Sequence, residues 1–156
     1  MRNKQKGFSL IELLIVVAII LIIAAIAIPN LLRSRMAANE ASAVGSLRTI
    51  NTACITYATT YGTGFPVALA NLGPATPATA ALADLLDAVL AAGSKSGYNF
   101  AYAQPGPVAG IVQTYTVNAD PITPGTTGQR HFFTNQSGVI RFNTTVPATV
   151  ADPPIQ

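Results

Sequence analysis

Residues 7–29 read GFSLIELLIVVAIILIIAAIAIP, and this stretch decides the fold of the chain. From Phe8 to Ile28 it holds 21 residues, of which only Ser9 and Glu12 are polar. As an α-helix these residues would rise by about 1.5 Å each, or roughly 32 Å, enough to cross a hydrocarbon core of about 30 Å. Because lipid offers no hydrogen bonds to exposed N–H and C=O groups, the stretch is predicted to be a membrane-spanning helix.

The seven residues ahead of this stretch are basic and polar. Arg2, Lys4 and Lys6 are predicted to keep the N-terminus on the cytoplasmic side, which places everything after Pro29 outside. These three residues also account for the formal net charge of +3, since the rest of the chain has six basic and six acidic side chains. The charge therefore gives no support for nucleic-acid binding, which usually needs clustered Lys and Arg.

Three interpretations of the apolar stretch compete. A cleaved secretory signal would find an A-x-A-like site at residues 25–27, but its apolar part would exceed the usual 7–15 residues and contain a carboxylate. A plain single-span anchor leaves Glu12 unexplained, because an ionisable group at that depth costs about 2.5–3.5 kcal/mol. The third interpretation is a cut between Gly7 and Phe8, which creates an α-amino group one helical turn before Glu12.

Such a cut suggests how identical chains could assemble. The carboxylate of Glu12 in one helix could meet the terminal amine of Phe8 in an axially staggered neighbour. In a low-dielectric environment this pair would specify the register, because any slip leaves two charges unpaired. The stagger is a hypothesis that the remaining sequence does not test.

The string Gly7-Phe8-Ser9-Leu10-Ile11-Glu12-Leu13, after a short basic leader and before an unbroken apolar run, resembles the cleavage and methylation motif of type IV prepilins. Pseudopilins of type II secretion systems share this motif. The resemblance covers Met1 to about Pro29 closely and Tyr61–Gly64 loosely. It implies that an inner-membrane prepilin peptidase recognises Gly7, that Phe8 becomes the N-methylated mature N-terminus, and that Glu12 directs assembly.

Pro29 is predicted to kink the helix without ending it, because it lacks an N–H and crowds the carbonyl of Ala25. The resemblance further implies that residues 21–29 lose helical structure when the subunits assemble. From Asn30 to about Tyr61 the pattern becomes amphipathic, and Gly62 and Gly64 are predicted to end the helix. One apolar stripe follows steps of three and four: Ala43, Leu47, Ile50, Cys54, Tyr57 and Tyr61.

The remaining residues predict a small head. Residues 65–77 are interpreted as a connector, and residues 80–92 as a short helix capped by Thr79 and Gly93. Four β signals follow, at residues 98–102, 111–119, 130–134 and 139–143, the last two forming a hairpin around residues 135–138. The predicted fold is α+β, a long N-terminal helix packed on an antiparallel sheet of about four strands.

Few residues of the head suggest a catalytic or metal-binding role. Asp84 and Asp87, three apart on the predicted helix, are interpreted as acids that favour its first half rather than as a catalytic or metal pair. His131 is interpreted as a packed or surface residue. Asp120 lies in a predicted loop, but a single carboxylate is weak support for a calcium site, because calcium takes 6–8 oxygen ligands. The single cysteine, Cys54, excludes an intrachain disulfide and is expected to be buried and inert. No cofactor or metal is predicted.

Two short segments, residues 135–137 and 143–145, match the N-glycosylation pattern Asn-x-Ser/Thr, which has many chance matches.

The predicted organisation is a cleaved leader (1–7), an assembly helix (8–29), a head (30–143) and an irregular C-terminal tail (144–156). The leading functional hypothesis is a structural, non-enzymatic subunit of a type IV pilus-like filament, serving adhesion, motility or DNA uptake. Its expected partners are copies of itself, prepilin peptidase, an inner-membrane assembly platform and, before assembly, membrane lipid. It would be an inner-membrane precursor and then an extracellular filament. A periplasmic pseudopilin of type II secretion and a membrane-tethered binding protein are the alternatives.

Overall fold

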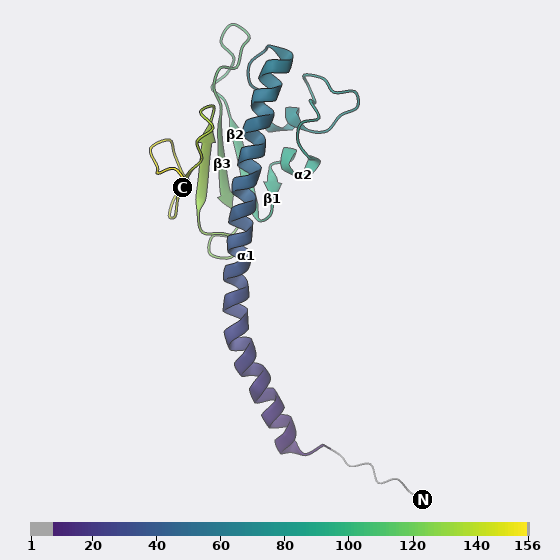
Figure 1. Ribbon diagram of the computed structural model, residues 1–156, viewed down its shortest axis with the longest axis vertical. Coiled ribbons are helices and arrows are strands. Elements are labelled where there is room, and N and C mark those ends of the chain that lie inside the picture. The colour runs from purple at the N-terminus through teal and green to yellow at the C-terminus, as the bar shows by residue number, and fades with distance from the viewer. Residues whose placement is uncertain (1–7, 156) are drawn as a thin grey trace, which may run out of the picture. The chain divides into compact units, whose positions relative to one another are not determined.

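The computed structural model describes residues 8–155. The chain divides into two compact units, one ending at Arg35 and the other beginning at Met36. A single helix, α1 (Leu10–Tyr61, 52 residues), supplies the first unit and continues into the second. Figure 1 shows the part of α1 after Met36 lying along the sheet of the head.

The second half of α1 supplies one side of the core, as the apolar stripe predicted. Ala43, Leu47, Ile50 and Cys54 are completely buried, Tyr57 is nearly so, and Tyr61 is partly buried against the same core. The helix ends at Tyr61, where Gly62 and Gly64 adopt left-handed backbone angles with φ of 67° and 77°. Both the stripe and the C-terminus of the helix are therefore confirmed.

Gly64 also explains how the chain leaves the helix. A Cβ atom at this position would collide with the carbonyl oxygen of Val112. The backbone passes so close because Phe65 N donates to Val112 O at 2.9 Å and Val112 N donates to Thr63 O at 3.2 Å. Only glycine combines this close approach with the left-handed angle.

The sheet of the head has five antiparallel strands in sequence order, not about four. They are β1 (Ser94–Lys95), β2 (Tyr98–Ala103), β3 (Thr116–Pro121), β4 (His131–Asn135) and β5 (Arg141–Asn143). The strand that the sequence missed, β1, is only two residues long, too short for any alternation of polar and apolar residues. It joins β2 through Ser96 and Gly97, whose φ angles of 51° and 75° suit a tight two-residue hairpin.

The inner face of the sheet follows the alternation in its strands. Tyr98 and Phe100 of β2 point into the core, and Tyr102 packs at its margin, as the three alternating aromatics predicted. Val117, Ala119 and Phe132 are completely buried on the same face. The predicted hairpin is also confirmed, since Phe132 pairs with Phe142 across β4 and β5.

The second predicted strand is displaced along the sequence. It was expected at residues 111–119, but β3 runs from Thr116 to Pro121. Ile111 and Val112 instead make isolated bridges to Val108 and Gly64. Asp120 therefore lies in a strand, not in the loop where the sequence placed it.

The predicted helix at residues 80–92 is largely wrong. Only α2 (Ala88–Ala91) is helical, with Asp87 rather than Thr79 as N-cap and Ala92 rather than Gly93 as C-cap. A short 3₁₀ helix, η1 (Leu69–Leu72), lies within the predicted connector. The backbone N–H groups of residues 83–86 donate to the carbonyls of residues 71–73, and Asp84 has a φ of 54°. These bonds to η1 replace the helical bonds that the sequence pattern suggested.

Residues 144–155 form no strand or helix, but they are tied to the sheet. Ile155 N donates to Ile140 O at 2.9 Å, Phe142 N donates to Pro153 O at 3.1 Å, and Asn118 Nδ2 donates to Ala148 O at 2.8 Å. The segment thereby covers part of the outer face of the sheet. It explains why Phe133, which points outward, is only 7% exposed.

Candidate functional site

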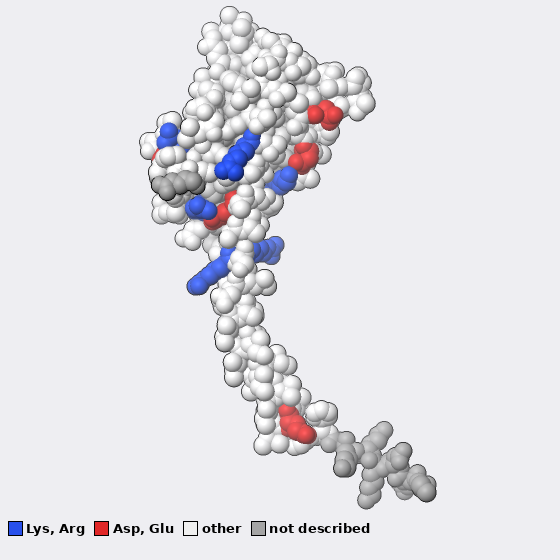
Figure 2. Space-filling model, in the orientation of Figure 1, with Lys and Arg blue, Asp and Glu red and all other residues white. Residues whose placement is uncertain are grey.

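The apolar half of α1 is exposed in the part of the chain that the structure describes. From Leu10 to Ile28 every side chain is exposed except that of Ala24, which is partly buried. None of the residues in the most apolar stretch of α1 is buried. A core helix of a soluble protein would be mostly covered, so the length and composition of α1 indicate a helix able to cross a membrane. Figure 2 shows the same region as a rod almost free of charged side chains.

The predicted site residues lie at the start of this rod. Gly7, on the leader side of the predicted cut, lies outside the described residues. Phe8 is 85% exposed and precedes the first turn of α1. Glu12 lies in that first turn, where the partial positive charge of a helix N-terminus favours an acid.

The structure adds a contact that the sequence analysis did not identify. The Ser9 backbone N–H donates to Glu12 Oε2 at 2.9 Å, and Leu13 N donates to Ser9 O at 3.2 Å. Ser9-Leu10-Ile11-Glu12 has the S-x-x-E spacing of a capping box, in which the acid accepts from the N-cap backbone N–H. This spacing could have revealed the contact. It fixes the Glu12 carboxylate against the backbone one residue after Phe8.

The contact between Ser9 and Glu12 leaves the Glu12 carboxylate able to bind a cation. Glu12 is the only charged residue between Phe8 and Leu32. Its carboxylate already accepts one hydrogen bond from its own chain, but a carboxylate has about four acceptor positions. A cation at the same depth can therefore bind it without breaking the bond to Ser9.

Pro29 lies inside α1, and the helix continues through it as the sequence analysis expected. Arg33 and Arg35 follow within two turns and are exposed, so the uncharged part of the helix ends there. The kink at Pro29 stays a prediction.

Asp87, His131 and Asp120, which the sequence also singled out, have structural partners within the head. Asp87 Oδ1 caps α2 by accepting from Leu90 N at 3.0 Å, and its Oδ2 pairs with Lys95 Nζ at 2.9 Å. His131 Nδ1 lies 2.6 Å from Asp120 Oδ1, which joins β3 and β4 on the outer face of the sheet. Burial raises the pKa of the Cys54 thiol to about 12, so the thiol is protonated and unreactive at neutral pH.

The head also contains an ion pair between Glu40 and Arg130 that the sequence did not predict. Glu40 Oε1 accepts from the backbone N–H groups of Gln129 and Arg130 at 2.9 and 3.1 Å, and Arg130 Nε donates to Glu40 Oε2 at 2.7 Å. Burial alone would raise the pKa of Glu40, but these donors outweigh it and hold the pKa below its usual value. The pair joins α1 to the loop before β4, and no local sequence signal links two residues so far apart.

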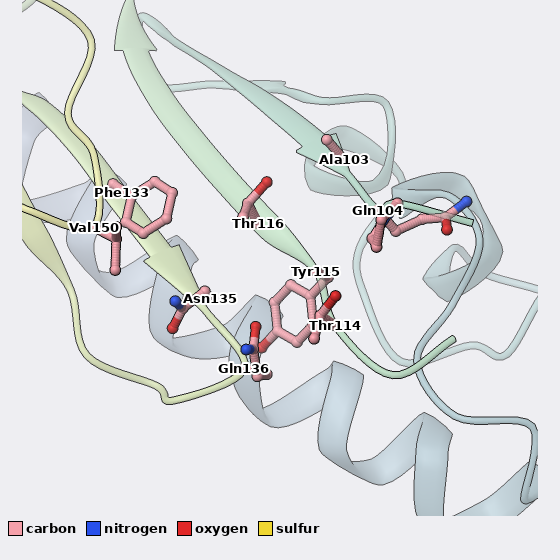
Figure 3. Close-up of a pocket in the computed structure, with 10 residues that line it drawn as sticks. Ala103, Gln104, Thr114, Tyr115, Thr116, Phe133, Asn135, Gln136 and Val150 are labelled. Carbon is pink, nitrogen blue, oxygen red and sulfur yellow. The ribbon is translucent and has the colours of Figure 1, made fainter. Parts of the chain in front are cut away.

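Among residues 8–155, no three His, Cys, Asp or Glu side chains come together as a metal site would require. A cavity of about 500 Å³ lies on the sheet, between the loop after β2 and the end of β4 (Figure 3). It is lined by uncharged side chains, among them Gln104, Thr116, Phe133 and Asn135. Among the described residues, those at the start of α1 stand out for a function, because they combine an exposed apolar helix with a single acid.

Comparisons with known proteins point to the same residues. A family described as the prokaryotic N-terminal methylation motif matches residues 2–28. The resemblance to the type IV pilin group is thereby confirmed over this motif.

Individual pilins are similar to this chain over segments longer than the family match. The type IV wide pilus major component PilA4 of Thermus thermophilus is 68% identical over 40 residues, 26% of this chain and 30% of that protein. The type IV major fimbrial protein FimA of Dichelobacter nodosus is 48% identical over 58 residues, 35% of this chain and 37% of the relative. The type IV major pilin protein PilA of Myxococcus xanthus is 48% identical over 50 residues, 32% and 23% of the two chains.

The chain thus matches only between 23% and 37% of the length of these curated relatives. No solved structure matches the chain significantly. The family match at residues 2–28 ends before the unit that begins at Met36.

Proposed function

We propose that this chain is the structural subunit of a type IV pilus-like filament, which polymerises through residues 8–29 after prepilin peptidase cuts between Gly7 and Phe8. The observation that carries the proposal is the exposed apolar helix with one acid in its first turn. A helix so apolar needs a non-aqueous environment. Lipid provides it before assembly, and the same helix from neighbouring subunits provides it afterwards.

The cut supplies a cation for Glu12. In the uncut chain the nitrogen of Phe8 is an uncharged amide. Cleavage converts it into an amine, and N-methylation keeps its positive charge. A neighbour displaced along the filament axis brings that amine to the Glu12 carboxylate, which the contact to Ser9 already orients. An opposite charge in apolar surroundings then offsets the cost of burying the acid.

The names of the three relatives favour a pilus over the pseudopilus of a secretion system, because all three describe major components of pili or fimbriae. The proposed route runs from an inner-membrane precursor, with the head in the periplasm, to an extracellular filament. An inner-membrane assembly platform would drive this transfer. Adhesion, motility and DNA uptake are all compatible with such a filament.

Mass determination of the mature protein tests the cleavage. We expect the chain from the cell envelope to begin at Phe8 and to carry one N-methyl group. A chain that begins at Met1 would instead support a membrane-tethered protein.

Substitution of Glu12 tests the assembly step. Glu12→Ala and Glu12→Gln should both be cleaved normally, but filament yield should fall at least tenfold because no acid remains for the neighbouring amine. Glu12→Asp is the matched control, since it keeps the charge on a shorter side chain and should keep most of the yield. Normal filament yield from Glu12→Gln would contradict the proposed role.

A further inference from the structure

The head contains two Asn-x-Ser/Thr segments whose first residues have the same local geometry. Asn135 ends β4 and Asn143 ends β5. Asn135 Oδ1 accepts from the backbone N–H and the hydroxyl of Ser137, at 3.0 and 2.7 Å. Asn143 Oδ1 accepts from the same two groups of Thr145, at 3.0 and 3.1 Å. The side-chain oxygens of both asparagines therefore accept the same two bonds, and Asn143 Oδ1 accepts a third from Val146 N at 3.3 Å.

The side-chain nitrogens of Asn135 and Asn143 differ in their hydrogen bonds. Asn143 Nδ2 donates to Asp152 Oδ1 at 2.8 Å, and the other oxygen of that carboxylate accepts from the N–H and hydroxyl of Thr149. The bonds from the Thr149 backbone, Asn143 and the Thr149 hydroxyl hold the pKa of Asp152 below its usual value, so the acceptor is charged at neutral pH. Asn135 Nδ2 has no hydrogen-bond partner among residues 8–155.

The surroundings of Asn135 also leave space for an attached group. Figure 3 shows Asn135 and Gln136 at one end of the cavity, close to Tyr115, with Phe133 and Val150 along its side. Its volume of about 500 Å³ lies within the range of small-molecule sites, about 300–1,000 Å³. The apolar wall suits the C–H face of a sugar ring, and the neighbouring amides and hydroxyls suit its hydroxyl groups.

We propose that Asn135 is the attachment site of an N-linked glycan, whereas Asn143 stays unmodified. The donor would be a glycan joined through a diphosphate to a polyprenyl lipid, with a membrane-bound transferase as catalyst. Asn135 Nδ2 attacks the anomeric carbon, the bond from that carbon to the phosphate oxygen breaks, and the lipid diphosphate leaves with the bonding electrons. Nδ2 gives up one proton to the transferase. The proposal depends on the extracytoplasmic location of the head in the proposed function.

Peptide mapping by mass spectrometry of the chain purified from its own cells tests the assignment. We expect a glycan on the peptide that contains Asn135 and none on the peptide that contains Asn143. Asn135→Gln and Ser137→Ala should lose the glycan, whereas Ser137→Thr, which keeps the hydroxyl, should retain it. Asn143→Gln should leave the glycan unchanged. A bare Asn135, or equal occupancy at Asn143, would overturn the proposal.

Two further measurements separate modification from folding and from the proposed function. Thermal unfolding of Ser137→Ala should show a folded head, so that loss of the glycan reflects the missing hydroxyl. Asp152→Ala removes the partner of Asn143 Nδ2 and should allow a glycan at Asn143; a bare Asn143 in this folded variant would contradict the explanation of selectivity. Normal filaments with a bare Asn135 would overturn the glycan proposal alone, whereas a glycosylated chain that still begins at Met1 would contradict the cleavage alone.

Discussion

The start of α1 and the head are both rich in apolar side chains, but they use them in opposite ways. Leu14 of the first unit is 59% exposed, whereas Leu47, farther along the same helix, is completely buried. The head covers its apolar residues with its own sheet and loops. The first unit leaves them exposed, so the apolar content of the chain serves folding in the head and, in the proposed filament, association in the first unit.

The largest expected effect concerns the bond that separates the leader from the apolar helix. Gly7→Val should abolish cleavage, because a branched side chain beside the bond obstructs the peptidase, and full-length precursor should accumulate in the inner membrane. Gln5→Val, which places the same side chain two residues away, is the matched control and should be processed normally. Mass determination of the membrane-bound chain measures both. Normal processing of Gly7→Val would refute the peptidase assignment.

Two leucines of one helix test the comparison directly. Leu47→Ala should destabilise the head by about 2–5 kcal/mol, because it leaves a cavity in a closed core. Leu14→Ala should leave the stability of the head unchanged, since this side chain belongs to the first unit and is 59% exposed. Chemical denaturation in detergent, followed by a signal from the head tyrosines, measures both variants. Equal destabilisation by the two substitutions would show that the regions do not differ as described.

The ion pair of Glu40 and Arg130 tests whether the head is held by its own contacts. Glu40→Gln should lower the stability by about 1.5–3 kcal/mol at neutral pH, the range for hydrogen bonds to a charged group. Because the pKa of Glu40 is lower in the folded state, its contribution is present above the unfolded pKa and is lost as pH falls through the folded pKa.

The stability difference between wild type and Glu40→Gln should therefore shrink as the pH is lowered below about 4.3, the usual pKa of a glutamate. Unfolding curves at a series of pH values give this difference. A difference that does not change with pH would show that the charge of Glu40 contributes nothing.

The smallest effect separates two glycines of the head. A Cβ at Gly45 meets nothing within 4 Å, so Gly45→Ala should stabilise α1 by up to about 1 kcal/mol. A Cβ at Gly128 would collide with the ring and hydroxyl of Tyr98, which is completely buried, so Gly128→Ala should destabilise the head. Thermal unfolding of the two variants should show shifts of opposite sign. Shifts of the same sign would contradict this placement of Gly128.

The parts of the fold that the sequence predicted depend on local pattern. The stripe from Ala43 to Tyr61, the glycines after it and the alternating aromatics of β2 each follow from spacing within a single element. The contact between Ser9 and Glu12 is likewise local, because it follows from the S-x-x-E spacing of a capping box.

The parts of the fold that could not be predicted from the sequence depend on contacts between distant residues. The pattern at residues 80–92 is helical, but the backbone of residues 83–86 bonds to η1 instead. The strand β1 is defined only by its pairing with β2, and Glu40 is linked to Arg130 only by the folded head. The roles of Gly7, Phe8 and Glu12 came from a motif whose partners are other molecules, so a single chain does not test them.

The position of Glu12 in an assembled filament tests the account most directly. A filament structure at side-chain resolution gives the distance between its carboxylate and the terminal nitrogen of Phe8 in the adjoining subunit. We predict an oxygen–nitrogen distance of about 4 Å or less, the range of an ion pair. Filaments in which the two groups lie far apart, each with another partner, would contradict the proposed register.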